Sequence, residues 1–181
     1  MSRILIGLTG SIACYKTCEL ISVFRKRGHS VKCMMTEAST RFITPLTLET
    51  LTGEKAVTGM FDLPGTRTPG HIALAEWADM VMIAPASADM IARVACGMCG
   101  DIVSCTVCST QKPVLLAPAM NDRMYNNPMV RENIRKLENA GYFFVGPVRG
   151  MLACGREGMG HLAPVDEITS AVEKILNNAH E

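Results

Sequence analysis

The sequence predicts an α/β domain in which a parallel β-sheet is covered by helices on both faces. Three observations support this class: short apolar runs of strand length, intervening stretches with apolar residues at helical spacing, and Gly or Pro residues between them. Strands that alternate with helices favour parallel pairing. The chain has 181 residues, 48% of them apolar, which suits one compact domain. We therefore expect a single domain over residues 1–181.

Five segments are expected to form the sheet. Residues 3–8 are an almost continuous apolar run, as in a strand that is buried on both faces. The later strand segments have the same character and are bounded by Gly, Pro or polar residues. In chain order, the expected strands are residues 3–8, 31–35, 80–84, 114–117 and 142–145.

Helices are expected between these strands. Gly28 is suited to end the first helix, and Pro128 and Gly141 stand at the start and just past the end of a later one. In chain order, the expected helices are residues 12–27, two short stretches within 37–52 broken by Pro45, 71–78, 86–95, 102–109, 128–140 and 165–179. This alternation is typical of a Rossmann-like (flavodoxin-like) three-layer sandwich with right-handed crossovers. Residues 53–70 and 149–164, rich in Gly, are expected to be long loops.

Charge and composition exclude several partners. The net charge is +1, with no basic stripe for nucleic acid and no acidic tail. No run reaches the roughly 18 apolar residues of a membrane span. No export signal is evident, so the cytoplasm is the expected compartment and the eight cysteines are expected to be mostly reduced.

The turn after the first strand is a candidate phosphate site. Gly10, Ser11 and Ile12 follow that strand and open a helix, where backbone N–H groups and the helix dipole favour an anion. A plain tight turn explains the same residues equally well. The turn is not Gly-x-Gly-x-x-Gly, and no acidic residue follows at the ribose position, so a dinucleotide is disfavoured.

Three blocks of sequence together resemble a known family. They are PGHIALAEWADMVMIAPASAD at 69–89, PAMNDRMY at 118–125 and ACGREGMG at 153–160. Their combination and order resemble the homo-oligomeric flavin-containing cysteine decarboxylases over essentially the whole chain. Two departures stand out. Tyr125 replaces the Trp of that family's Pro-x-Met-Asn-x-x-Met-Trp signature, and Gly100-Asp101 lacks the Asn of the Asn-Asp or Asp-Asn that many relatives have near this point.

The resemblance implies flavin mononucleotide (FMN) as the cofactor. It also implies a homo-oligomer, either a trimer or a dodecamer built from the same trimeric contact, with each active site at a subunit boundary. The residues that it assigns to the cofactor are Gly10, Ser11, Ile12, Thr36, Glu37, Ala38, Ser87, Ala88, Asp89, Met90 and Ala119.

The resemblance also implies the chemistry. Within the family the chain is most similar to members that decarboxylate 4′-phosphopantothenoylcysteine in coenzyme A biosynthesis. FMN oxidises the substrate thiol to a thioaldehyde, CO2 leaves and the product is reduced again. Decarboxylation of a peptide C-terminal cysteine is one alternative, and a flavin-binding regulatory subunit without turnover is another.

Four residues would serve the substrate. His71 resembles the family's base, Asn121 would bind the carboxylate, Met124 would shape the site, and Cys154 resembles the acid that completes the saturated thiol. Each also has a structural interpretation. His71 could bond backbone at a helix start, Asn121 could cap a turn, and Met124 and Cys154 could be core residues.

The remaining cysteines raise the question of a metal site. Cys96-x-x-Cys99 and Cys105-x-x-Cys108 are spaced as zinc ligand pairs, but only five residues separate the pairs and the second pair falls within an expected helix. We expect no metal site.

Overall fold

The computed structural model describes residues 1–61, 68–151 and 155–178. Five strands form the main sheet, and two more form a separate hairpin. The strands are β1 (Arg3–Leu8), β2 (Ser30–Met35), β3 (Met80–Ala86), β4 (Val114–Pro118), β5 (Phe143–Phe144), β6 (Val148–Met151) and β7 (Glu157–His161). The helices are α1 (Cys14–Lys26), the 3₁₀ helix η1 (Glu37–Arg41), α2 (Pro45–Thr52), α3 (Gly70–Trp77), α4 (Ala88–Ala95), α5 (Ile102–Ser109), α6 (Asp122–Tyr125), α7 (Pro128–Asn139) and α8 (Val165–Asn178).

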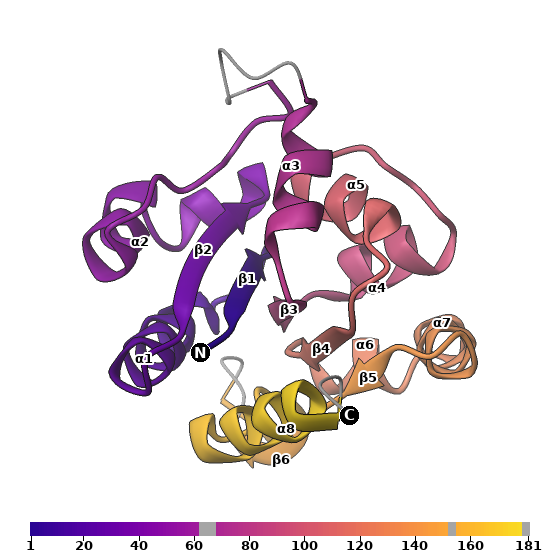
Figure 1. Ribbon diagram of the computed structural model, residues 1–181. Coiled ribbons are helices and arrows are strands. Elements are labelled where there is room, and N and C mark those ends of the chain that lie inside the picture. Colours follow the sequence, from indigo (N-terminus) through magenta and orange to yellow (C-terminus); the bar gives the residue numbers. More distant parts are fainter. Residues whose placement is uncertain (62–67, 152–154, 179–181) are drawn as a thin grey trace.

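The five main strands are all parallel, in the order β2-β1-β3-β4-β5. Figure 1 shows α1 and α8 on one face of this sheet and α3, α4 and α5 on the other. The side chains of β1, β3 and β4 are almost all buried, as their continuous apolar sequences predict. The flavodoxin-like three-layer fold is therefore confirmed.

Two buried clusters hold the layers together. One joins the first face to α1 and α8 through residues such as Leu20, Phe24 and Val172. The other joins the opposite face to α4, α5 and α7 through Ile91, Val103 and similar side chains. Because both faces are covered, the hydrophobic side chains of the central strands are removed from water on both sides.

The strand order reverses between β1 and β3, and one buried hydroxyl joins the two strands there. Thr9, 1% exposed, donates to the carbonyl of Pro85 (2.6 Å) and accepts from the N–H of Ser87 (2.9 Å). One turn into α1, the buried Thr17 hydroxyl donates to the carbonyl of Ala84 (2.8 Å). These bonds fix the loop after β1 against the end of β3.

The expectation of a loop over residues 149–164 was wrong. β6 and β7 pair antiparallel within it, with Gly150 opposite Gly158. Its glycines permit close approach: a Cβ at Gly160 would lie 2.1 Å from the carbonyl oxygen of Met120. The sequence signal was misleading because glycine marks both loops and tight backbone packing. The short helix α6 was also not predicted.

Replacing Thr9 by Val should destabilise the fold by about 1–3 kcal/mol, because the buried Pro85 carbonyl and Ser87 N–H would lose their partner. Urea unfolding monitored by circular dichroism measures this. Thr50→Val is the matched control, since the exposed Thr50 hydroxyl bonds only within its own helix. Equal unfolding midpoints for the two variants would show that the bridge contributes nothing.

Candidate active site

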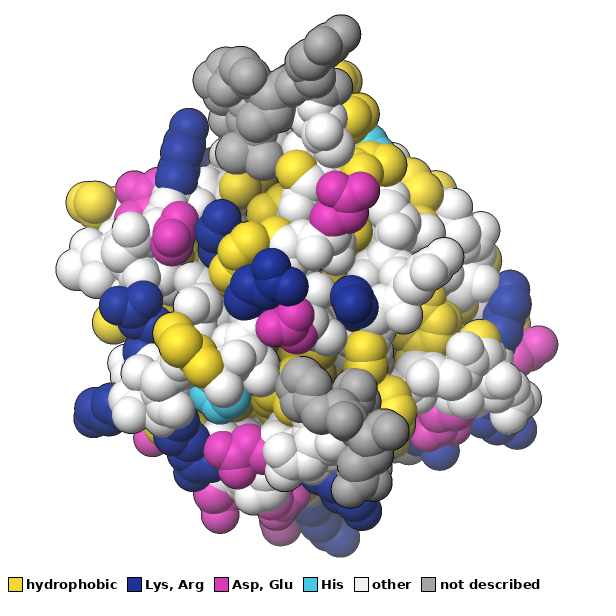
Figure 2. All heavy atoms as spheres, in the orientation of Figure 1, with side chains coloured by type: hydrophobic (Ala, Val, Ile, Leu, Met, Phe, Trp, Pro, Cys, Tyr) yellow, Lys and Arg dark blue, Asp and Glu magenta, His cyan; other side chains and the backbone are white. Residues whose placement is uncertain are grey.

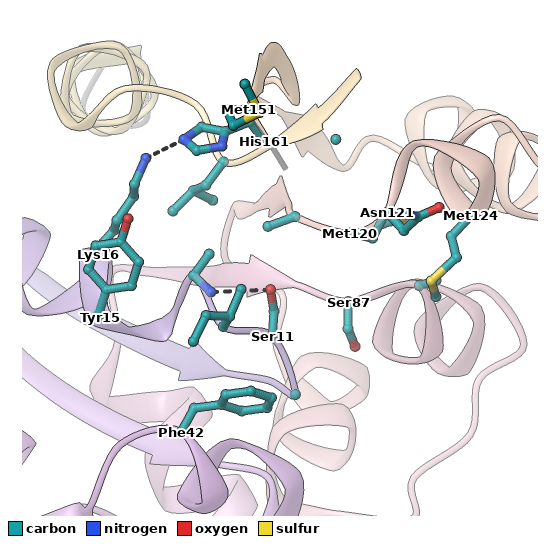
Figure 3. A pocket seen from close by; sticks show the side chains of 17 residues that line it. Ser11, Tyr15, Lys16, Phe42, Ser87, Met120, Asn121, Met124, Met151 and His161 are labelled. Carbon is teal, nitrogen blue, oxygen red and sulfur yellow. Dashed lines mark hydrogen bonds between the residues drawn. The ribbon is translucent and has the colours of Figure 1, made fainter. Parts of the chain in front are cut away.

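A cavity of about 550 Å³ opens where β1, β3 and β4 end. Its walls come from the loop after β1, the first turn of α1, the start of α4, the segment after β4 and the β6–β7 hairpin. Open parallel sheets bind ligands at this edge, beside the point where the strand order reverses. The volume is within the range of small-molecule sites. Figure 3 shows the side chains that line it.

The predicted phosphate turn lies in this cavity. Gly10, Ser11 and Ile12 all line it, and Ser11 Oγ accepts from the N–H of Ala13 (3.4 Å). Gly10 packs against Ala38, whose Cβ would lie 2.9 Å from a Cβ added at Gly10. A larger residue at position 10 would therefore collide with Ala38 or reduce the space near the start of α1.

The segment after β3 contributes only part of its predicted set. Ser87 and Ala88 line the cavity, and Ser87 Oγ caps α4 by accepting from the N–H of Met90 (3.2 Å). The Met90 side chain is buried in the core, and the Asp89 carboxylate, 71% exposed, pairs with Arg93 (2.8 Å). Neither of these two side chains lines the cavity, which limits their predicted cofactor contacts to the backbone.

Residues 36–38 border the cavity without lining it. Thr36 caps η1 by accepting from the N–H of Ser39 (3.3 Å), and Ala38 lies against Gly10. Phe42, just after η1, does line the cavity. Ala119, which follows β4, lines it as predicted. The sheet edge thus gathers predicted residues from three separate loops.

Asn121 and Met124 both line the cavity. The Asn121 side-chain oxygen accepts from the N–H of Arg123 (2.9 Å), so this residue does cap a turn, that of α6. The cap directs the carboxamide oxygen to the backbone, and its NH2 group is then the end suited to a carboxylate. Capping uses the oxygen of this side chain, whereas a carboxylate would be bound by its NH2 group.

His71 lies in the first turn of α3 and is not among the residues that line the cavity. Its Nδ1 is buried and has no hydrogen-bond partner within the part of the chain that the structure describes. The bond from this nitrogen to backbone, one of the structural interpretations of His71, is therefore not formed there. Within one chain, His71 and Asn121 are not brought to the same cavity. Cys154, the predicted acid, lies outside the described residues.

The β6–β7 hairpin covers the cavity near α6. The N–H of Met120 donates to the carbonyl of Gly160 (3.0 Å), and Arg156 pairs with Asp122 (3.4 Å). Met151 and Gly160, from the two strands of the hairpin, line the cavity. The hairpin is therefore bound to the segment that carries Asn121.

Several lining residues were missed from the sequence, among them Tyr15, Lys16, Phe42 and His161. Lys16 is the only Lys, Arg, Asp or Glu among the described residues that line the cavity. One signal could have identified it, because a cation in the first turn of a helix opposes the helix dipole. His161 carries no such signal, since only the hairpin brings it to the cavity.

The cysteines of the described segments do not form an evident reactive centre. Burial raises the pKa of the Cys14 thiol to about 11, and that of Cys108 also to about 11, so both thiols are protonated at neutral pH. Within the described residues, no group of three or more His, Cys, Asp or Glu side chains is placed to hold a metal ion. Nor is any described helix long and apolar enough to cross a membrane.

Comparison with known proteins establishes the family. The flavoprotein family model matches residues 1–177. The chain belongs to the flavoprotein family. The resemblance inferred from the sequence is thereby confirmed.

Relatives within the flavoprotein family share the whole length of this chain. The coenzyme A biosynthesis bifunctional protein CoaBC of Haemophilus influenzae is 40% identical over 179 residues, which are 99% of this chain and 45% of that protein. The chain thus spans about half the length of this relative. The solved structure of a PPC decarboxylase mutant complexed with pantothenoylaminoethenethiol has a TM-score of 0.86 and 29% identity, covering 97% of this chain and 98% of the other. The FMN-dependent cysteine decarboxylase SpaF also has a TM-score of 0.86, with 28% identity and coverage of 100% and 98%.

A methyl group at Gly160 should displace the hairpin from the cavity. In Gly160→Ala the new Cβ would collide with the Met120 carbonyl at 2.1 Å, a backbone atom that cannot rotate away. We expect a loss of about 1–3 kcal/mol in unfolding free energy and increased proteolysis within the hairpin. Gly100→Ala is the control, because its Cβ would meet only the flexible end of Arg93 at 3.0 Å. Equal proteolysis rates for both variants would contradict this packing.

Proposed function

We propose that this chain is an FMN-dependent decarboxylase that converts 4′-phosphopantothenoylcysteine to 4′-phosphopantetheine in coenzyme A biosynthesis. The observation that carries the proposal is the cavity at the β1–β3 reversal, where Ser11, Ser87 and Asn121 from three loops line one space. The family match and the CoaBC relative support the same reaction.

The cavity suits FMN. Its lining is mostly apolar, as the flat isoalloxazine ring requires, and includes Ile12, Ala119 and Leu162. The start of α1, whose N-cap residue makes no side-chain cap hydrogen bond, offers backbone N–H groups for the phosphate. When bound, FMN supplies a reversible two-electron oxidation at the carbon that bears the substrate thiol.

The residues of the chain orient the substrate and move its protons. Asn121 holds the carboxylate through its NH2 group. Because this donor is neutral, it lacks the strong charge pairing that would oppose release of the carboxylate as CO2. Met124 packs beside it at the cavity wall. His71 takes a proton from the substrate thiol or from the carbon beside it, and Cys154 returns a proton to the product.

We propose that His71 acts in the cavity of a neighbouring subunit of a homo-oligomer, a trimer or a dodecamer. Three observations support this. His71 does not line the cavity of its own chain, and its buried Nδ1 has no partner in the described residues. Exposed apolar side chains also surround the cavity, including Ile12 (56%), Tyr15 (61%) and Phe42 (48%). Such a surface is typical of a subunit interface.

His71→Asn should lower the rate of CO2 release by about 10²- to 10⁴-fold, the usual contribution of a general base, while FMN stays bound. Product mass spectrometry and flavin absorbance measure the two effects. His29→Asn is the matched control, because the Nδ1 of His29 is likewise buried without a hydrogen-bond partner in the described segments, and His29 has no proposed role in the reaction. Normal turnover in His71→Asn would exclude this residue as the base.

Mixed oligomers test the shared site directly. Co-expressed His71→Asn and Asn121→Ala chains, each inactive alone, should recover activity at about a quarter of the sites, since random mixing leaves that share with both native residues. If both residues served the cavity of one chain, mixing would restore nothing.

Cys154→Ser should still release CO2 but accumulate the oxidised enethiol, because the final protonation lacks its acid. Mass spectrometry of the product distinguishes the enethiol from the saturated thiol, because their masses differ by two hydrogen atoms. Clean formation of the saturated thiol would remove Cys154 from this role.

A further inference from the structure

Lys16 and His161 form a polar pair at one end of the cavity. Lys16 Nζ lies 2.6 Å from His161 Nε2, although 145 positions separate the two residues in the chain. Figure 3 shows the pair on the side of the cavity opposite Asn121 and Met124, with Ser11 and Ser87 between. None of the roles proposed above uses it.

The hydrogen bond gives each side chain of the pair a role. A lysine ammonium only donates, so with Lys16 in that form His161 Nε2 is the acceptor. Lys16 forms no ion pair with any carboxylate of the described residues within 4.0 Å. Its positive charge therefore faces the cavity without a direct counter-charge in that part of the chain.

Lys16 lines two hollows, and the charges around it favour an anion in the main cavity. A second hollow, between α1 and α8, is also lined by Lys16, and it carries the carboxylates of Glu19 and Asp166, which repel a phosphate. Its other cation, Arg27, already forms an ion pair with Glu173. The main cavity has no acidic lining residue among those described. Lys16 also lies in the first turn of α1, where the helix dipole disfavours a cation and favours an anion.

We infer that Lys16 binds a phosphate monoester at the end of the cavity opposite Asn121, and that this phosphate is the distal group of the substrate. The inference rests on the proposed function, and it explains how the chain would select the phosphorylated substrate. 4′-Phosphopantothenoylcysteine is a linear molecule with a carboxylate at its cysteine end and a phosphate at the other. The cavity matches this arrangement, with an amide donor at one end and an ammonium at the other.

His161 is a positioning residue in this site. Its neutral ring accepts from the ammonium and holds it above the cavity, which limits the rotamer freedom of the long lysine side chain. Because His161 is on β7, the anion site is complete only when the hairpin is in place. A peptide that ends in cysteine, without a phosphate, would leave Lys16 unpaired.

The test compares two substrates on the FMN-loaded chain, 4′-phosphopantothenoylcysteine and its unphosphorylated analogue pantothenoylcysteine. Lys16→Met should lower the ratio of kcat/KM for the phosphorylated over the unphosphorylated substrate by about 10- to 100-fold, mainly through KM. His161→Leu should lower the same ratio by about 3- to 10-fold, and His161→Gln, which keeps an acceptor, should restore most of it. Lys26→Met, at the exposed end of the same helix, should leave the ratio unchanged.

A second arm identifies the phosphate. The FMN dissociation constant of each variant is measured by flavin fluorescence. If Lys16→Met weakens FMN binding by the factor by which it weakens the phosphorylated substrate, Lys16 belongs to the cofactor phosphate and the inference is wrong. An unchanged substrate ratio in Lys16→Met would also overturn it.

Binding of 4′-phosphopantothenate and pantothenate, which lack the reacting cysteine, separates this inference from the proposed reaction. Preferential binding of the phosphorylated compound, lost in Lys16→Met, would support the anion site even if the wild-type chain released no CO2. Equal binding of the two compounds by the wild-type chain would reject the anion site, whatever the turnover.

Discussion

The hydroxyl of Thr9 is the interaction on which the geometry of this molecule depends. It joins the ends of β1 and β3 at the point where the strand order reverses, and it does so in the interior, where an unpaired polar group is costly. The two loops that it connects carry Ser11 and Ser87, so both are held at fixed positions on one cavity. A hydroxyl that is both donor and acceptor is required, and a purely apolar residue of the same shape could not replace it.

Backbone packing gives the cavity its other wall. The β6–β7 hairpin approaches the segment after β4 so closely that only glycine fits at position 160. This contact places Met151 and His161 opposite the loops of the sheet edge, and the ion pair between Arg156 and Asp122 supports it. The apolar lining and Lys16, the one formal cation among the described lining residues, then suit a ligand that combines a flat ring with anionic groups. Figure 2 shows positive and negative side chains mixed over one outer face. That face therefore has no large positive patch that would attract an anionic ligand away from the cavity.

The proposed division of the active site between two subunits would explain why His71 and Asn121 do not meet in one chain. Asn121 lies at the cavity and His71 does not, and apolar side chains remain exposed around the opening. Assembly of an oligomer would both bury these side chains and bring His71 of a neighbouring subunit to the cavity. In this arrangement activity depends on assembly. A separated subunit would bind the substrate carboxylate but would lack the base that takes the proton from the substrate thiol or from the carbon beside it.

The alternation of strands and helices, and with it the flavodoxin-like fold, could be read from the amino-acid pattern alone, because buried parallel strands need continuous apolar runs. The pattern of residues also placed Gly10 and Ser11 at the sheet edge, since they follow a strand that ends there, and the family resemblance assigned Ser87, Ala119 and Asn121 to the same site. The hairpin within residues 149–164 became visible only in the folded chain, because glycine spacing does not distinguish a loop from close backbone packing. The contact between Lys16 and His161 could likewise be found only in the structure. It joins residues 145 positions apart and depends on how the hairpin packs, so no local sequence pattern indicates it.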